Sequence, residues 1–289
     1  MIALLAAARA IHLASLMAIF GASAYLVLLR RAELPCPPAR PMRILLVLAA
    51  SLALASSTAW FCLIAGQMSG SWANATDLPT LQLAASGTRF GQIFLVRFVG
   101  LAALWLLCVF VRVHALAIAI LAGLLLATLG FVSHAAAING DLAFGAAAND
   151  AVHLLTAGFW LGGLMALALL VPRHWRDPAE LLGPLRIFSI WGTLVVALLV
   201  ATGMINAVSI LPLSALSFHN PYFDLLAVKV GLALAMIALA SLNRWRFAPA
   251  IRNQRPGAVR QLASSIGVEI VLGVSVVAIV GLLGLIAPH

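Results

Sequence analysis

Long apolar runs, separated by short stretches rich in charge, proline and glycine, make up most of the chain. A helix needs about 20 apolar residues, at a rise of about 1.5 Å per residue, to cross the hydrocarbon of a bilayer. The two runs that meet around Arg112 are together too long for one crossing and therefore predict two. The whole pattern predicts eight helices, near residues 2–29, 43–66, 92–111, 113–138, 150–171, 186–210, 224–246 and 263–287.

Composition agrees with this pattern. The chain has 289 residues, of which 64% are hydrophobic and 9% charged, whereas a soluble domain carries about 25% charged residues. An ordinary soluble enzyme is therefore excluded. The first run contains Arg9 and lacks the basic segment and cleavage site of a signal peptide, so we expect it to remain as a helix. We expect an all-α polytopic membrane protein, an eight-helix transmembrane bundle in which residues 1–289 form a single transmembrane domain.

The excess of positive charge, +9 in total, predicts orientation. In a soluble protein it would indicate a nucleic-acid partner. Here 13 of the 17 basic residues flank the odd-numbered connections between the predicted helices. By the positive-inside rule these connections face the cytoplasm, and both termini are then periplasmic. The expected surroundings are membrane lipid, with no nucleic acid bound.

Several soluble-enzyme motifs are absent from the sequence. There is no GxxxxGK[ST] phosphate loop, so the chain has no ATP site, and there is no GxSxG, HExxH or Rossmann glycine motif. The three cysteines form no CxxC pair, so neither a disulfide framework nor a thiolate zinc site is predicted.

A few ionisable residues lie inside the predicted spans, where each is costly and therefore a functional candidate. Each also has a structural alternative. Arg9, Arg97 and Lys229 could extend to the lipid head groups. Glu269 could form a structural ion pair with the basic face, which we favour over a role as a proton relay. The candidates are Arg9, His12, Arg97, His134, His153, Lys229 and Glu269.

The histidines give the most specific prediction. His134 near the end of the fourth span and His153 near the start of the fifth are joined by a short connection, which places both rings at a similar depth. His12 lies in the same half of the membrane, somewhat deeper. We expect His134 and His153 to bind a metal ion as a pair, with His12 as a further ligand one level deeper, although a lone membrane histidine is as often structural. Asp150, one turn before His153, is expected to orient its ring or to complement the helix dipole.

Ligand chemistry indicates which metal. Imidazole with sulfur suits copper, while magnesium, calcium and manganese need carboxylate clusters that the spans lack. Met68, Met204 and Cys62 are possible auxiliary ligands, against the alternative that methionine only fills apolar space. Asn206 is a polar side chain at the outer depth and is expected to line a polar path.

The segment 150–163, DAVHLLTAGFWLGG, resembles the most recognisable stretch of the CopD (copper resistance protein D) family of bacterial inner-membrane proteins. The similarity covers nearly the full length, because further segments follow in the family's order. These are ARAIHLASLMAIFGA in the first span, TRFGQIFLVR at 88–97, VSHAA around His134, KVGLALAMIALASLNRWRFAP at 229–249 and EIVLG from Glu269.

The resemblance implies an eight-helix inner-membrane protein that handles copper together with a small periplasmic copper-binding protein, CopC. It also implies that the family's membrane histidines fall on His12, His134 and His153. Because no CopC-like β domain precedes the first helix, we expect the partner to be a separate protein.

Three functions follow from these residues. The first is copper homeostasis or resistance: copper taken from the periplasmic side passes through the membrane histidines for import or loading. The second is electron transfer by a b-type haem, as in a quinol-linked cupric reductase, because paired histidines in a helix bundle also hold haem. The chain would be an oxidoreductase in the second case and a transporter or metal-binding protein in the first. The third is an assembly protein whose histidines are structural.

Overall fold

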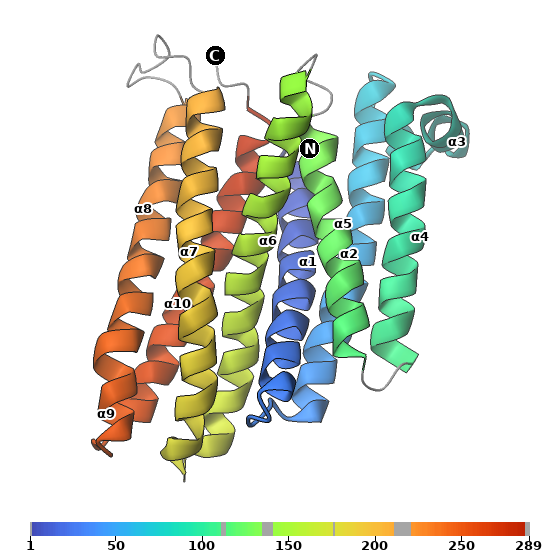
Figure 1. The fold of residues 1–289 in the computed structure, drawn as a ribbon. Helices are drawn as coiled ribbons and strands as arrows, with labels where there is room; N and C mark the ends of the chain where they lie inside the picture. Colours follow the sequence, from blue (N-terminus) through green and yellow to red (C-terminus); the bar gives the residue numbers. More distant parts are fainter. Residues whose placement is uncertain (1, 111–113, 135–140, 176, 211–220, 287–289) are drawn as a thin grey trace.

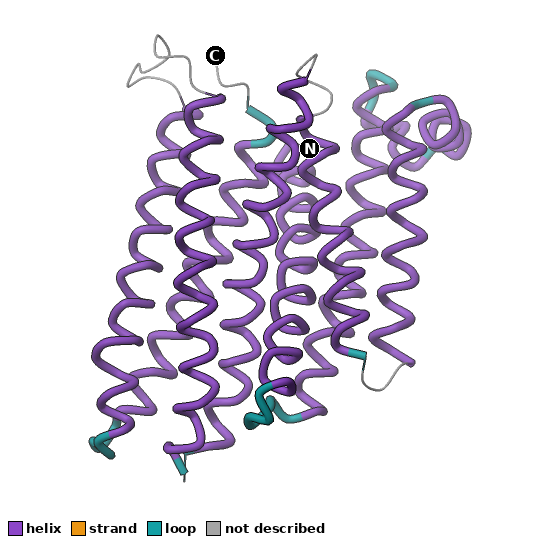
Figure 2. The backbone as a smooth tube through the Cα atoms, in the orientation of Figure 1, coloured by secondary structure: helices purple, strands orange, loops and turns teal. Residues whose placement is uncertain are grey.

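The computed structural model describes residues 2–110, 114–134, 141–175, 177–210 and 221–286, with side chains outside the description also at 132–134, 141–143, 209–210 and 221. Within these ranges every regular element is a helix, joined by short loops (Figure 2). The predicted all-helical membrane architecture is thereby confirmed.

Seven of the described helices are long and apolar enough to cross a membrane. An eighth, α5 (Ala115–His134), has a shorter apolar stretch, Ala115–Phe131, and packs between α1 and α6 on one side and α4 on the other. The seven spans are built on α1 (Ile2–Arg31), α2 (Ala39–Met68), α4 (Arg89–Phe110), α6 (Asp141–Leu170), α7 (Leu182–Ile210), α8 (Pro221–Leu242) and α10 (Ala258–Leu283).

Helices α1 and α6 form the centre of the bundle (Figure 1). They approach closely because glycines meet at their crossing: a methyl group on Gly21 would overlap the carbonyl oxygen of Gly158, and one on Gly162 would meet the backbone of Met17. Small residues permit such close backbone packing in membranes. Helices α2, α4 and α5 lie on one flank of this central pair, and α7 and α8 lie on the other (Figure 1). The buried side chains of α1 and α6 therefore face one flank or the other, the partner helix, or α10.

Three helical segments differ from the predicted pattern. The connection expected at 67–91 contains a 3-10 turn (Trp72–Thr76) and a short helix α3 (Leu78–Gly87). The carboxylate of Asp77 caps α3 by accepting from the Thr80 amide at 3.0 Å, and the Thr80 bonds lower the pKa of that carboxyl. Helix α6 begins at Asp141 instead of near 150, because the alanine-rich stretch before the apolar run is also helical. Helix α8 continues through a π-helical turn (Asn243–Phe247) into α9 (Ala248–Arg252).

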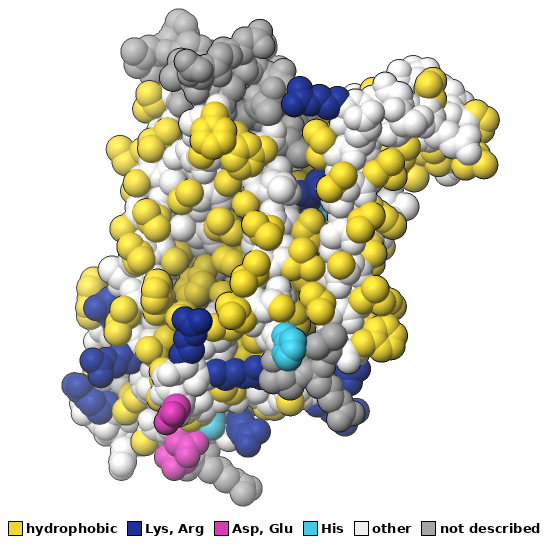
Figure 3. Space-filling model, turned by 45° about the vertical axis from the view of Figure 1, so that its right-hand side comes forward, with side chains coloured by type: hydrophobic (Ala, Val, Ile, Leu, Met, Phe, Trp, Pro, Cys, Tyr) yellow, Lys and Arg dark blue, Asp and Glu magenta, His cyan; other side chains and the backbone are white. Residues whose placement is uncertain are grey.

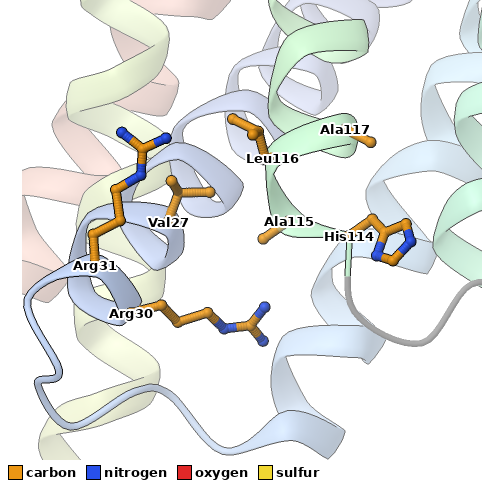
Figure 4. A pocket seen from close by; sticks show the side chains of 7 residues that line it. All are labelled: Val27, Arg30, Arg31, His114, Ala115, Leu116 and Ala117. Carbon is orange, nitrogen blue, oxygen red and sulfur yellow. The ribbon is translucent and has the colours of Figure 1, made fainter.

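One end of the bundle is strongly basic. Figure 3 shows most of the visible Lys and Arg side chains gathered there. At this end a cavity of about 450 Å³ opens between the end of α1 and the start of α5, lined by Arg30, Arg31 and His114 (Figure 4). Its two guanidinium groups make it a poor site for a metal cation. Helix α1 begins and α10 ends at the opposite end of the bundle (Figure 1).

The glycine contact at the centre predicts a stability change. Gly21→Ala should lower the free energy of unfolding by about 1–3 kcal/mol, because its methyl group cannot fit without moving α6. Gly231→Ala on α8 is the matched control, since its methyl group meets nothing within 4 Å and alanine favours the helix. Thermal unfolding in detergent measures both; equal melting temperatures for the two variants would contradict this packing.

Candidate functional site

His12 is fully enclosed and both of its ring nitrogens are engaged. The side chain is 1% exposed. Nδ1 lies 3.0 Å from the carbonyl oxygen of Ala53 on α2, and Nε2 lies 3.1 Å from Nη2 of Arg97 on α4. A carbonyl only accepts and a guanidinium only donates, so Nδ1 carries the hydrogen and Nε2 accepts. In this arrangement His12 is a neutral ring with no nitrogen left for a metal ion.

Arg97 ties three helices together. It is 4% exposed, so the alternative that it snorkels to the head groups is wrong. Besides His12 on α1, its guanidinium donates to the carbonyl oxygen of Leu125 at 2.8 Å and to the hydroxyl of Thr128, both on α5. A buried arginine needs such acceptors because no water replaces them at this depth. None of the hydrogen-bond partners described for Arg97 is a carboxylate, so the cluster is electropositive.

An aromatic layer covers this cluster toward the end where α1 begins. The Trp60 ring lies edge-on to the His12 ring, with centroids 5.8 Å apart, and also meets Phe94 at 5.4 Å. Arg9 stacks over Trp60 at 5.4 Å and donates to the carbonyl oxygen of Gly284 at 2.6 Å. Arg9 therefore closes the end of the bundle by joining α1 to the end of α10.

His153 has a different environment, on the opposite flank. Its Nδ1 lies 2.9 Å from the hydroxyl of Thr202 on α7. That hydroxyl gives its own hydrogen to the carbonyl oxygen of Leu198 at 2.7 Å, so it accepts from Nδ1–H. This fixes the tautomer of the neutral ring and leaves the lone pair on Nε2. An imidazole held in this way by its other nitrogen is the usual form of a histidine metal ligand.

Amide and charged groups surround His153. Asn149, one turn before it, donates to the Thr202 carbonyl at 3.1 Å and to Oδ1 of Asn206 at 2.6 Å. Asn206 thus belongs to a polar group between α6 and α7. Asp150 and Lys229 of α8 both interact electrostatically with the His153 ring. Asp150 was expected to orient the His153 ring. The hydroxyl of Thr202 on α7 holds Nδ1 instead.

The structure does not bring His12 and His153 together. The hydrogen-bond partners of His12 lie on α2 and α4, and that of His153 lies on α7, so the two rings point to opposite flanks of the central helices. The side chain of His134 lies outside the described residues. In the part of the chain that is described, no group of three or more His, Cys, Asp or Glu side chains could hold a metal ion.

The possible sulfur ligands lie away from these rings. Met204 is 65% exposed and lies two positions after Thr202, on the opposite side of α7, so it points away from His153. Met68, at the end of α2, is also exposed, and Cys62 is half-buried on the same helix. The described geometry gives none of these sulfurs a contact with His12 or His153.

Glu269 is the remaining buried charge candidate. It is 0% exposed, and its Oε1 accepts from the Nδ2 of Asn243. The expected ion pair with the basic face is absent from its described contacts, because the π-helical turn after α8 presents a carboxamide there instead. Sequence reasoning missed Asn243, Thr128 and Thr202, since short polar residues in apolar runs carry no signal without knowledge of the facing helix.

Two family models match the chain. "Copper resistance protein D-like, N-terminal domain" matches residues 1–145, and "Copper resistance protein D" matches residues 183–283. The chain belongs to the copper resistance protein D family. The Copper resistance protein D of Pseudomonas syringae pv. tomato is 30% identical over 289 residues, covering 95% of this chain and 93% of that protein.

Two further relatives extend the comparison. The Inner membrane protein YebZ of Escherichia coli (strain K12) is 28% identical over 98% of this chain and 97% of its own length. The Copper transport protein CutJ of Bacillus subtilis (strain 168) is 32% identical over 53% of this chain and 28% of that longer protein. No solved structure matches the chain. This member of the copper resistance protein D family is a multi-pass inner-membrane protein, and two of its relatives are named for copper resistance and copper transport.

The Arg97 cluster predicts a measurable coupling. Arg97→Met should lower the free energy of unfolding by about 1–3 kcal/mol, because His12 Nε2 and the acceptors on α5 lose their donor. A double-mutant cycle with His12→Ala should give a coupling of about 0.5–3 kcal/mol. Arg89→Met is the control, since Arg89 is exposed at the start of the same helix. Strictly additive effects of the Arg97 and His12 changes would refute the contact.

Proposed function

We propose that this protein takes copper from the periplasmic side and passes it through membrane histidines for import or loading, in copper homeostasis or resistance. The observation that carries the proposal is His153, whose Nδ1 is held by Thr202 so that Nε2 presents a lone pair. Neutral imidazole is a good ligand for copper. The names of the copper resistance and copper transport relatives support the same substrate.

Orientation follows from charge. The basic end of the bundle faces the cytoplasm by the positive-inside rule, with α5 as the eighth crossing and both termini periplasmic. His153 lies in the first half of α6, which begins at the opposite, periplasmic end. His134, at the end of α5, belongs to the same end and supplies the second imidazole. Asn149 and Asn206 offer amide oxygens to the ion as it leaves water, because a bare charge cannot enter the bilayer.

Electrostatics favours His153 over His12 as the first ligand. Near His153 the positive charge of Lys229 is opposed by the negative charge of Asp150. Near His12 the guanidinium of Arg97 occupies Nε2 and none of its described partners is acidic. His12 therefore ligates copper only after Arg97 has moved, and it serves the resting state as an anchor for Arg97.

The copper function is preferred to b-type haem. Axial haem ligands must face each other across one iron atom. His12 and His153 point to opposite flanks, and His12 has no free nitrogen. The relatives' names refer to copper and give no support to haem. As the family resemblance implies, we propose that a separate periplasmic CopC-like protein delivers the copper, with membrane lipid as the only other partner.

Copper binding by purified protein tests this proposal. Replacing both His134 and His153 by alanine should remove the tightly bound copper, measured as metal per protein after dialysis. Thr202→Val should lower copper affinity by about 10- to 100-fold, because the ring loses the group that fixes its tautomer.

The matched control is His114→Ala, at the basic end of the bundle, which should keep the full copper content. Unchanged stoichiometry in the His134 and His153 double variant would reject these histidines as the site. A near-ultraviolet circular dichroism spectrum like that of the wild type shows that the variants are folded.

A further inference from the structure

Glu269 and Asn243 meet in the half of the bundle that ends in the basic residues. Glu269 lies on the fourth turn of α10, which begins at that end, and Asn243 is the first residue of the π-helical turn after α8. The Asn243 Nδ2 donates to the Glu269 Oε1. Isolated π-helical turns are frequent at functional sites, and this one turns a carboxamide toward the only glutamate of the described spans.

Each member of this pair has a buried oxygen without a partner. In the described part of the chain neither Oε2 of Glu269 nor Oδ1 of Asn243 has a hydrogen-bond donor. A buried acceptor without a donor costs about 1–3 kcal/mol. A buried carboxylate without compensation costs more, because it also carries an unpaired charge. Both unsatisfied atoms are acceptors, and they belong to two side chains that already share one hydrogen bond.

A single proton satisfies both atoms. If Oε2 carries hydrogen, it donates to Oδ1 of Asn243 while Nδ2 donates to Oε1. A carboxylic acid and a carboxamide each present one donor and one acceptor along an edge, so together they close a ring of two hydrogen bonds. The ionised form allows only one of these bonds. The pair is therefore complementary in the protonated state.

No described cation lies against Glu269 to replace that proton. Helix α10 packs against α1, α6, α8, the π-helical turn and α9, whose Arg252 is exposed. The Asn243 carboxamide hydrogen-bonds the carboxyl, and the Trp160 indole of α6 lies near it without completing a hydrogen bond to Oε2. Arg244, in the π-helical turn, donates instead to the Thr193 hydroxyl, and Arg246 is exposed. From the other helices, Arg9 of α1 is bound at the opposite end, and Lys229 of α8 interacts with the Asp150 and His153 groups.

We propose that Glu269 and Asn243 form a proton-binding site within the membrane, in which Glu269 is protonated at neutral pH. This proton exchanges with the aqueous phase at the basic end. Ser265, one turn nearer that end on the same face of α10, has a buried hydroxyl without a partner and is the next polar group on the way.

Infrared spectroscopy of the protein in liposomes tests the site. At neutral pH the wild type should show the carbonyl stretch of a protonated carboxylic acid, and labelling glutamate with carbon-13 should shift it. Glu269→Gln should remove the band while keeping a two-bond ring with Asn243. Asn243→Leu should move its frequency, because the hydrogen bonds are lost.

Glu180→Gln is the matched control. Glu180 is exposed at the basic end beside His174, so its replacement should leave the band unchanged. A band that survives in Glu269→Gln, or its absence from the wild type, would overturn the site. A carboxylate stretch from Glu269 that shifts with sodium concentration would overturn it in favour of a metal cation. The isotope shift in the wild type decides the matter even if a variant fails to fold.

Discussion

The structure depends on one constraint: a polar group at membrane depth must find its partner inside the protein, because lipid offers none. Each buried polar side chain therefore joins helices as well as carrying its own chemistry. Arg97 joins α4 to α1 and α5, Thr202 joins α7 to α6 through His153, and Asn243 joins the end of α8 to α10. The apolar surfaces of these helices do not specify their neighbours, since lipid is equally apolar. The few polar contacts, and the glycine crossing of α1 with α6, specify which helices lie side by side.

The same constraint separates the histidines by role. At His12 both nitrogens are used inside the bundle, so the ring is part of the framework. At His153 one nitrogen is used to hold the ring and the other is left with its lone pair. The two rings have the same chemistry, but their different partners leave a ring nitrogen without a hydrogen bond only at His153. A count of membrane histidines is therefore a poor guide to the number of metal ligands.

Features that depend on neighbouring residues in the sequence could be predicted, whereas features that depend on contacts between distant helices could not. The apolar runs predicted the helical membrane architecture, because the length needed to cross a bilayer is a local property of the chain. The short helix α3 was not predicted because it lies in the connection between two spans, and the signal for it is only the capping residue Asp77. His12 and His153 were expected in the same half of the membrane from their positions in the spans, whereas the direction of each ring depends on which helix faces it. The Asn243 contact with Glu269 requires a π-helical turn that no sequence periodicity indicates.

We propose that copper binds an imidazole nitrogen of His153 at the periplasmic end of the bundle. X-ray absorption spectroscopy at the copper edge of the loaded, detergent-purified protein reports the ligands of the metal. The spectrum should show nitrogen ligands with the multiple scattering of imidazole, weakened when His153 alone is replaced by alanine. A shell of sulfur alone, or imidazole scattering that is identical in the His153 variant, would contradict it.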